Sequence, residues 1–464
     1  FMDLDFKKIV EPYFDEALTT LVKNVQINSV YDPLTVSTSS PYGLGVKKCF
    51  DFLKEIALKD GFEVDTCDGR CLEISYGKGD NLIYVFAHQD VVPVNGVWDD
   101  DPFSGAIKDD RVYGRGTSDD KGPGISAYFA LKALKDNNLI DDYRVRLVFG
   151  GDEERGSSCL EYYFHNLKKE DPTYGFTPDG DFPLIYGEKG ICNYEYKSKY
   201  DFKDIIEIDA GTVSNAVIDK AKVIVKNPEV LDKYLSDHPT IKFEKEAENT
   251  YVFIGKPAHG SLPEEGINSG IIMLHCLGEA YNEPILTLLS NEYLDPFGKN
   301  MYVFKETKDM GKTTFNVGII KYKDGEFSMI VNFRYPSGVD VNNTIAKIQD
   351  CSPFKVITIS NADPLYFNPE TTPFIKKLME VYQEETGSEE KPMAIGGGTY
   401  AKEAKNTVAF GSHFLGKEDN IHASNEHIDL EDFYTSMPIY AHAIYALGKL
   451  KKWEQNLKSG LLTI

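Results

Sequence analysis

The chain has 464 residues, enough for two to four domains at roughly 150 residues each. Acidic side chains outnumber basic ones by 73 to 50, and a net charge of −23 repels phosphate backbones and anionic lipid, so we expect no nucleic acid and no membrane as partners. The hydrophobic share of 42% is that of a globular protein, and no stretch approaches the roughly 20 apolar residues of a membrane span.

The N-terminal segment and the cysteines both predict a cytoplasmic protein. The opening residues FMDLDFKKIVEPYFDEALTTLV are rich in acidic side chains and lack the apolar core and small-residue cleavage site of a signal peptide. The 7 cysteines are odd in number and include no CxxC pair, which is typical of reduced, isolated thiols rather than of a disulfide framework or a metal site.

The first third of the chain alternates helical and strand patterns. Residues 46–59 place apolar side chains on one helical face, and residues 82–87 (LIYVFA) form the wholly apolar run of a strand buried on both faces. Residues 122–137 again have helical periodicity, and residues 145–149 (VRLVF) form a second buried strand. Helices that alternate with buried strands predict an α/β domain with a mixed, mostly parallel sheet flanked by helices.

The pattern changes near residue 186. Segments such as KVIVK, NTYVFIGK and FSMIVNFRY alternate polar and apolar residues, as half-exposed antiparallel strands do, and helical stretches at 227–236 and 266–282 interrupt them. Helical character returns after Pro373. The sequence therefore predicts a discontinuous catalytic domain of residues 1–185 and 369–464, with an α+β lid domain with antiparallel sheets inserted at 186–368.

Chemically active side chains follow the predicted buried strands. LIYVFA leads into His88-Gln89-Asp90, VRLVF leads into GGDEE with Glu153 and Glu154, and the glycine-rich segment GRGTSDDKG lies between them. Because open α/β sheets bind ligands at the carboxyl ends of their strands, we expect these clusters to meet at one edge. Carboxylates gathered in this way need a compensating charge, which divalent cations can supply.

The residue types suit a two-metal site. Imidazole and carboxylate groups bind zinc, and one carboxylate can bridge two ions. Asp90 lies two residues beyond His88 and can fix its tautomer, while one carboxylate of the Glu153-Glu154 pair can bind metal as the other takes a proton from water. Neither an HExxH helix nor a GxSxG elbow occurs, and Gly114-Arg115-Gly116 lacks the third glycine of a dinucleotide loop.

Taken together, the motifs resemble a known family. FAHQDVVP, WDDDPF, GRGTSDDKGP and GGDEERGS look like the co-catalytic dinuclear metallopeptidases related to aminoacylase, carboxypeptidase G and the ArgE/DapE deacylases. GFTPD, GKPAHGSLPEEG, NFRYP, GGGTY and HASNE are closest to the PepV-type, carnosinase-like dipeptidases. The resemblance spans nearly the whole chain and implies a zinc-peptidase type of catalytic domain, of the phosphorylase/hydrolase-like class, with a lid.

The resemblance implies a role for each matching residue. One metal would be held by His88 and Asp179, the other by Glu154 and His422, with Asp119 bridging them across a cis Asp119–Asp120 bond. Glu153 matches the general base and Asp90 the carboxylate behind His88. From the lid, His259 matches the residue that stabilises the oxyanion, and Arg334 the one that binds the substrate carboxylate. The remaining substrate contacts implied are Asn215, Gly396, Gly397, Gly398 and Thr399.

The other histidines are expected to play no part in the metal site. His165, His238, His275 and His442 lie in ordinary helical or turn contexts. His413 and His427 lie nearer the motifs, and His427 competes with His422 as the late ligand; we expect His422 to be the ligand.

These features predict hydrolysis of the peptide bond of dipeptides or similarly short peptides, with a metal-bridging water as nucleophile and Glu153 as base. Two divalent ions are expected, zinc first, with manganese or cobalt as alternatives. The three ligand carboxylates and one hydroxide balance the four positive charges of two divalent ions. The alternatives are an N-acyl or N-succinyl amino acid deacylase with the same metals and, further off, a non-catalytic metal- or peptide-binding protein. An insert of about 180 residues resembles the doubled lid of PepV-type enzymes, from which we expect a monomer.

Overall fold

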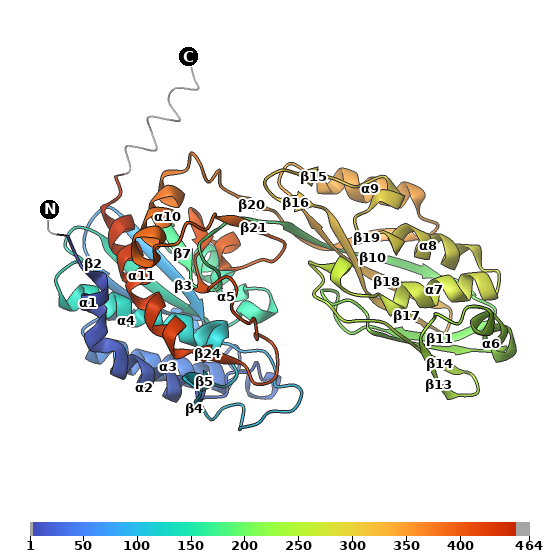
Figure 1. Ribbon diagram of the computed structural model, residues 1–464, viewed down its shortest axis with the longest axis horizontal. Helices are drawn as coiled ribbons and strands as arrows, with labels where there is room; N and C mark the ends of the chain where they lie inside the picture. Colours follow the sequence, from blue (N-terminus) through green and yellow to red (C-terminus); the bar gives the residue numbers. More distant parts are fainter. Residues whose placement is uncertain (1–2, 452–464) are drawn as a thin grey trace, which may run out of the picture. The chain divides into compact units, whose positions relative to one another are not determined.

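The computed structural model describes residues 3–451 and divides into two compact units (Figure 1). Unit 1 contains the described residues up to Tyr186, then Phe367–Met393, and those from Thr399 onward. Unit 2 contains Gly187–Tyr366 and the short segment Ala394–Gly398. In Figure 1, blue, cyan and orange-red segments make up unit 1, so both ends of the chain build it, whereas green to yellow segments make up most of unit 2.

Unit 1 is built on a mixed sheet with a parallel centre. The strand order β1-β2-β6-β3-β7-β22 places β6, β3, β7 and β22 parallel to one another, and the antiparallel β2 and β1 extend one side. These strands are β1 (Glu63–Asp65), β2 (Cys71–Gly77), β3 (Leu82–His88), β6 (Arg144–Gly150), β7 (Tyr174–Thr177) and β22 (Thr407–Ala409). Every residue of β3 is buried, as its apolar run predicts.

Helices cover the sheet of unit 1 and bury its apolar side chains. They are α1 (Phe6–Val10), α2 (Phe14–Val25), α3 (Leu44–Lys59), α4 (Gly122–Asp136), α5 (Ser158–Glu161), α10 (Pro373–Thr386) and α11 (Leu430–Lys449). Helices α4 and α11 pack against each other and against β3. Burying an apolar side chain of this core contributes about 1.5–3 kcal/mol. The expected helices at 46–59 and 122–137 and the two buried strands are confirmed.

Short strands complete unit 1 and the connections to unit 2. A three-stranded sheet joins β4 (Ala106–Lys108), β5 (Arg111–Tyr113) and β24 (His427–Asp429), and β8 (Gly180–Asp181) pairs with β23 (Ser412–His413). The chain passes between the units four times. Three passages lie in or directly after the short strands β9 (Ile185–Glu188), β20 (Leu365–Tyr366) and β21 (Met393–Ile395), and the fourth lies between Gly398 and Thr399.

Unit 2 contains an eight-stranded antiparallel sheet in the order β13-β14-β12-β11-β17-β18-β10-β19. Its strands are β10 (Gly190–Lys199), β11 (Ile205–Ala210), β12 (Lys220–Val225), β13 (Phe243–Ala247), β14 (Thr250–Ile254), β17 (Thr314–Lys323), β18 (Glu326–Tyr335) and β19 (Lys355–Ala362). Its helices are α6 (Pro228–Asp237), α7 (Ser269–Ala280), α8 (Pro284–Leu294) and α9 (Val341–Cys351), and a separate hairpin joins β15 (Glu306–Thr307) to β16 (Gly311–Lys312). The expected fold class, an α/β domain with an α+β insert of antiparallel strands, is confirmed.

Among the described residues, no helix is long and apolar enough to cross a membrane.

Candidate metal centre

The candidate metal centre of unit 1 lies where the central parallel strands end. His88 is the last residue of β3 and pairs in register with Gly150, the last residue of β6, so the segment with Glu153 and Glu154 begins beside it. Asp179 follows the end of β7 by two residues. Three loops from three adjacent parallel strands therefore converge on one edge, as expected for ligand sites in open α/β sheets.

Asp119 reaches the same edge from the turn that precedes helix α4. Residues Thr117–Lys121 form a single wide helical turn, within which Asp119 and Asp120 have non-helical backbone angles. The peptide bond between Asp119 and Asp120 is cis, as expected. Asp120 ties this turn to β3, because its Oδ2 accepts a hydrogen bond from the backbone N–H of His88 at 3.2 Å.

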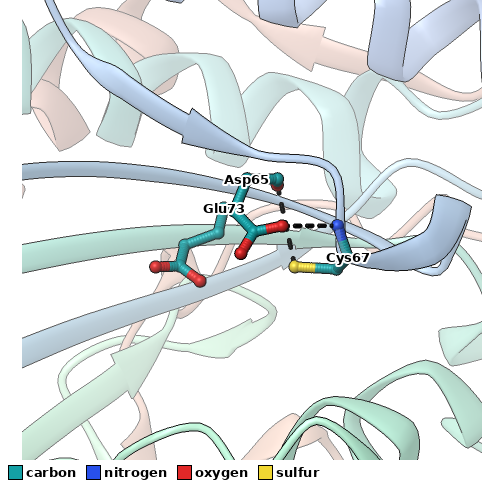
Figure 2. Close-up of side chains that lie close together, drawn as sticks. All are labelled: Asp65, Cys67 and Glu73. Carbon is teal, nitrogen blue, oxygen red and sulfur yellow. Dashed lines mark hydrogen bonds between the residues drawn. The ribbon is translucent and has the colours of Figure 1, made fainter.

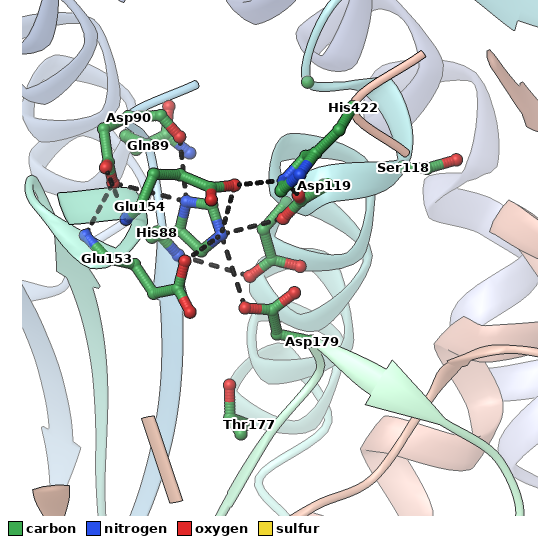
Figure 3. Close-up of polar contacts among 12 residues, drawn as sticks. His88, Gln89, Asp90, Ser118, Asp119, Glu153, Glu154, Thr177, Asp179 and His422 are labelled. Atoms are coloured by element: carbon green, nitrogen blue, oxygen red, sulfur yellow. Dashed lines mark hydrogen bonds and ion pairs between the residues drawn. The ribbon is translucent and has the colours of Figure 1, made fainter. Parts of the chain in front are cut away.

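The His88 ring directs one nitrogen toward a group of carboxylates. Its Nδ1 lies 2.8 Å from the backbone carbonyl of Asp90; a carbonyl only accepts hydrogen bonds, so Nδ1 carries a proton. In the neutral ring, Nε2 then has a lone pair, and it faces Asp119 Oδ1 at 2.9 Å and Asp179 Oδ2 at 3.3 Å (Figure 3). A lone pair directed at two carboxylates is stable only with a proton or a cation between them.

A second group of ligands shares Asp119. His422 Nε2 lies 2.9 Å from Asp119 Oδ2 and 3.1 Å from Glu154 Oε1. Asp119 therefore faces His88 with one carboxylate oxygen and His422 with the other, the arrangement of a bridging ligand (Figure 3). Three groups at this site have ligand atoms within 4.8 Å of one another. Two of them share Asp119: one is His88, Asp119 and Asp179, and the other is Asp119, Glu154 and His422. The third is His88, Glu153 and Glu154.

Asp90 holds the loop that carries Glu153 and Glu154. Its Oδ1 accepts the backbone N–H of Glu153 at 3.1 Å, and its Oδ2 accepts that of Glu154 at 3.0 Å. The side chain of Asp90 does lie behind His88, with Oδ1 3.3 Å from Nδ1, but the backbone carbonyl makes the shorter contact. Asp90 thus couples the ends of β3 and β6 as well as orienting the imidazole.

Glu153 lies beside the two groups with its carboxylate toward His88, 3.6 Å from Nε2. Burial, and then the neighbouring charge of Glu154, raise the pKa of Glu153 well above its usual value. Burial and the charge of Asp119 raise the pKa of Glu154 to about 8. Neighbouring buried carboxylates repel one another when all are ionised, and bound cations remove this repulsion. Raised carboxylate pKa values are therefore expected at a cation site that contains no cation.

The same carboxylates raise the pKa values of the two histidines. Burial disfavours the charged form of His88, but the carboxylates of Asp179 and Glu153 outweigh it and raise its pKa well above the usual value. For His422, burial also opposes protonation, yet the hydrogen bonds with Asp119 and Glu154 raise its pKa to about 11. The negative potential of the site therefore draws a positive charge to both imidazoles, which fits a pair of bound divalent ions.

A buried carboxylate that received no role from the sequence holds the turn containing Asp119. Glu426 Oε2 accepts the backbone N–H groups of Gly116 and Ser118, each at 3.0 Å, and that of Asp119 at 3.2 Å. Its Oε1 accepts Arg115 Nη1 at 3.0 Å in a pair with both side chains buried. Glu426 ends the HASNE segment, so the signal was present in the sequence, but the motif does not reveal that it binds the turn.

In unit 2, the predicted residues form two local groups. The segment of Asn215 lies beside that of His259: Ala216 forms a β-bridge with His259, and Asn215 O accepts the Gly260 N–H at 2.7 Å. Arg334, on β18, donates from Nη1 to Gly396 O at 2.6 Å, one of the contacts of residues 394–398 within unit 2. Gly396, Gly397 and Gly398 all belong to unit 2. Thr399 belongs to unit 1 and caps a short helical turn, where its side chain accepts the Ala401 N–H at 3.1 Å.

The ring of His259 has a defined tautomer. Its Nδ1 accepts the backbone N–H of Ser261 at 3.0 Å and lies 2.7 Å from the Ser261 hydroxyl. A backbone N–H can only donate, so in the neutral imidazole the proton is on Nε2.

Figure 2 shows a further group of potential ligands, Asp65, Cys67 and Glu73. Basic side chains neutralise its carboxylates. Lys169 Nζ lies 2.6 Å from Asp65 Oδ2 and 2.8 Å from Glu73 Oε2, and Arg146 lies 3.3 Å from Glu73. The Cys67 thiol is buried, and burial raises its pKa above the usual value. These charges are balanced without an ion, so the group is an ion-pair network rather than a metal site.

Two histidines outside the motif, His413 and His427, line a pocket together with Asp119 and Asp179. His413 pairs with Asp181 at 2.8 Å, and His427 Nδ1 contacts the Asn425 carbonyl at 3.0 Å. Neither belongs to a group of potential ligands among the described residues. All of the cysteines are free, as expected.

Comparison with known proteins identifies the family: this chain belongs to Peptidase family M20/M25/M40, which matches residues 84–446. It is 34% identical over 448 residues to "Putative dipeptidase YtjP" of Bacillus subtilis (strain 168), covering 92% of this chain and 96% of that protein. It is also 34% identical over 471 residues to "Putative dipeptidase SH1171" of Staphylococcus haemolyticus (strain JCSC1435), covering 95% and 99%.

Solved structures of low sequence identity share the fold. Human carnosine dipeptidase 1 matches with a TM-score of 0.56 at 14% identity, covering 96% of this chain and 98% of that chain. The dipeptidase Dug1p of Saccharomyces cerevisiae matches with a TM-score of 0.58 at 14% identity, covering 96% and 98%. The family expected from the motifs is confirmed, and the chain is a metallopeptidase, a hydrolase.

Proposed function

We propose that this metallopeptidase hydrolyses the peptide bond of dipeptides and similarly short peptides. The observation that carries the proposal is the cluster in which Asp119 faces His88 on one side and His422 on the other, with Glu153 beside it. The names of the relatives, dipeptidases from two bacterial genera, support the choice of substrate.

The ligand set fits two divalent ions. His88 and Asp179 would hold one ion, Glu154 and His422 the other, and Asp119 both. Mixed imidazole and carboxylate ligands suit zinc first, and manganese or cobalt as alternatives. When bound, the ions supply the positive charge that polarises the scissile carbonyl and makes water acidic near neutral pH.

Glu153 is the proposed general base. Its carboxylate is close to the ligand cluster, and it is not required to complete either of the two groups that share Asp119. It takes the proton of the attacking water on its carboxylate and passes it to the leaving amine. Asp90 supports this role by holding the backbone N–H of Glu153.

Residues of unit 2 are proposed to bind the substrate. The Nε2–H of His259, set by the Ser261 backbone, can donate to the oxyanion; losing such a donor typically costs about 10²–10³ in rate. Arg334 can bind the terminal carboxylate with its planar guanidinium. Asn215 and the segment of Gly396, Gly397, Gly398 and Thr399 are proposed as further contacts.

The test compares two substrate classes on the metal-loaded protein. We expect hydrolysis of a dipeptide with free termini and much slower turnover of an N-acetyl or N-succinyl amino acid. Faster turnover of the acylated substrate would favour the deacylase alternative. Metal binding without turnover of either would favour the non-catalytic alternative.

A further inference from the structure

A buried ion pair joins segments of unit 1 that carry metal-ligand residues. Arg115 Nη1 lies 3.0 Å from Glu426 Oε1, and both residues are fully buried. They are 311 positions apart, and Glu426 ends the HASNE segment that begins with His422. Burying an ion pair adds little net stability, because both charges lose their hydration, and Arg115 Nε also has no partner among the described residues. Stability alone therefore does not explain this pair.

Glu426 fixes the backbone of the turn that presents Asp119. A single carboxylate oxygen, Oε2, accepts three backbone N–H groups, which belong to Gly116, Ser118 and Asp119 itself. The position of Asp119 has to be exact, because one of its carboxylate oxygens faces His88 and the other faces His422. Three hydrogen bonds to a buried charge keep this turn in one conformation.

Arg115 extends the same pair to the loop of His422. Its Nη1 also donates to the carbonyl of Ala423, the residue after His422, at 3.0 Å. His422 has a left-handed backbone conformation, with a φ of 61°, which costs free energy for a residue with a side chain. Such a conformation persists only where the surrounding structure holds it, and the hydrogen bond from Arg115 is one of the contacts that do so.

The guanidinium of Arg115 also binds the loop that follows strand β3. Its Nη2 donates to the Pro93 carbonyl at 3.2 Å and to Asn95 Oδ1 at 2.9 Å. The guanidinium carbon lies 5.2 Å from the centre of the Trp98 ring, which covers it. A planar group with several N–H donors can hold all of these acceptors at once, whereas the ammonium of a lysine cannot. One side chain thus connects three segments of the candidate metal centre.

We propose that Arg115 and Glu426 are positioning residues, which set Asp119 and His422 in the geometry that metal binding requires. Neither belongs to a group of potential ligands among the described residues, so both act through the residues they hold. The ligand group that contains His422 depends on the pair twice, through Asp119 and through His422. The group that contains His88 and Asp119 depends on it only through Asp119. This inference rests on the proposed function, because it requires the two-metal centre.

The test measures Zn²⁺ binding to the metal-free full chain by competition with a chelator. The double variant Arg115→Met/Glu426→Gln removes both charges together, so no unpaired buried charge remains to unfold the protein. We expect the affinity for one ion to fall about 10–100-fold, and the affinity for the other to fall by less. Arg146→Met/Glu73→Gln removes another ion pair of unit 1 and is the matched control, which should bind both ions as the parent protein does.

Visible absorption of bound Co²⁺ identifies the weakened site, because the spectrum depends on the ligands around the ion. The ion that the double variant retains should give the same absorption as the ion retained by His422→Ala, which lacks a ligand of the weakened group. Arg115→Lys is the second variant. Its ammonium can still pair with Glu426 but cannot also reach the other acceptors of the guanidinium, so we expect the same site to be weakened in a folded protein.

Parent affinity for both ions in the double variant would overturn the role of the pair, as would an equal loss at both sites. If the double variant does not fold, the same two outcomes in Arg115→Lys decide. A parent protein that binds both ions but does not cleave a dipeptide would overturn the proposed function alone. A parent protein that binds fewer than two ions would overturn the two-metal centre and this inference with it.

Discussion

At the His88 ring, contacts on opposite sides decide which nitrogen can bind a metal. The Asp90 carbonyl accepts a hydrogen bond from Nδ1–H, and Nε2 faces Asp119 and Asp179. The HxD spacing predicted that Asp90 lies behind the ring. It could not show that the backbone carbonyl makes the closer contact while the carboxylate holds the next loop, because that depends on the register of β3 against β6.

Replacing each of the two adjacent glutamates in turn should distinguish the general base from the metal ligand. Glu153→Gln keeps the size of the side chain but cannot take a proton, so we expect kcat to fall about 10²–10⁴-fold with both metals retained. Glu154→Gln is the matched control, because Glu154 contacts His422 and belongs to a ligand group, and it should lose metal as well as activity. Metal content by elemental analysis and turnover of a dipeptide check both variants. Loss of metal in Glu153→Gln would remove Glu153 from the role of base.

Asp90→Asn should weaken metal binding. Both carboxylate oxygens of Asp90 accept backbone N–H groups, and an amide would turn an NH2 group toward one of these donors. We expect a loss of about 10–100-fold in metal affinity, measured by competition with a chelator. Asp152→Asn, one residue before the same loop segment, is the control, because its carboxylate contacts Ser158 instead. Equal effects of the two changes would contradict the role assigned to Asp90.

At the scale of helices and strands, the hydrophobic periodicity predicted the elements whose apolar side chains are buried. The apolar runs that became β3 and β6 and the helical faces that became α3 and α4 were all identified from the sequence. The assignment of residues 394–398 to unit 2 was not, because it depends on contacts between residues far apart in the sequence, such as the hydrogen bond between Arg334 and Gly396, which are 62 positions apart. The same applies to Glu426, whose partners lie in a turn more than 300 positions earlier.

Helix α8 carries a buried carboxyl group that should make unit 2 sensitive to pH. Glu292 is 6% exposed, its Oε2 has no partner among the described residues, and burial raises its pKa to about 7. A folded-state pKa above the ordinary value of 4.5 means that the folded state binds the proton more tightly. Its contribution to stability is therefore complete below pH 4.5 and is lost as the pH rises through about 7.

We expect the parent protein to become less stable between pH 5 and pH 8, and Glu292→Gln to reduce this loss, because the amide stays neutral. Denaturant unfolding followed at the two pH values checks this. Glu244→Gln, at an exposed position of β13, should behave as the parent does. A pH dependence that is the same in the parent and in Glu292→Gln would contradict the assignment.

At the scale of the whole molecule, the content of the inserted unit is relevant to the oligomeric state. Unit 2 has its own eight-stranded sheet and helices, and it contains both His259 and Arg334. We propose that each chain supplies its own lid residues and acts as a monomer. Sedimentation at assay concentrations should give a single species of about 52.1 kDa with full activity. Activity that appears only with a dimer would contradict this.

The most direct test of the account is a crystal structure grown with zinc, with anomalous scattering used to locate the ions. We expect two neighbouring peaks in unit 1, one between His88 and Asp179 and the other between Glu154 and His422, with Asp119 contacting both. Peaks at Asp65, Cys67 and Glu73 alone, or zinc bound without Asp119 between two ions, would contradict it.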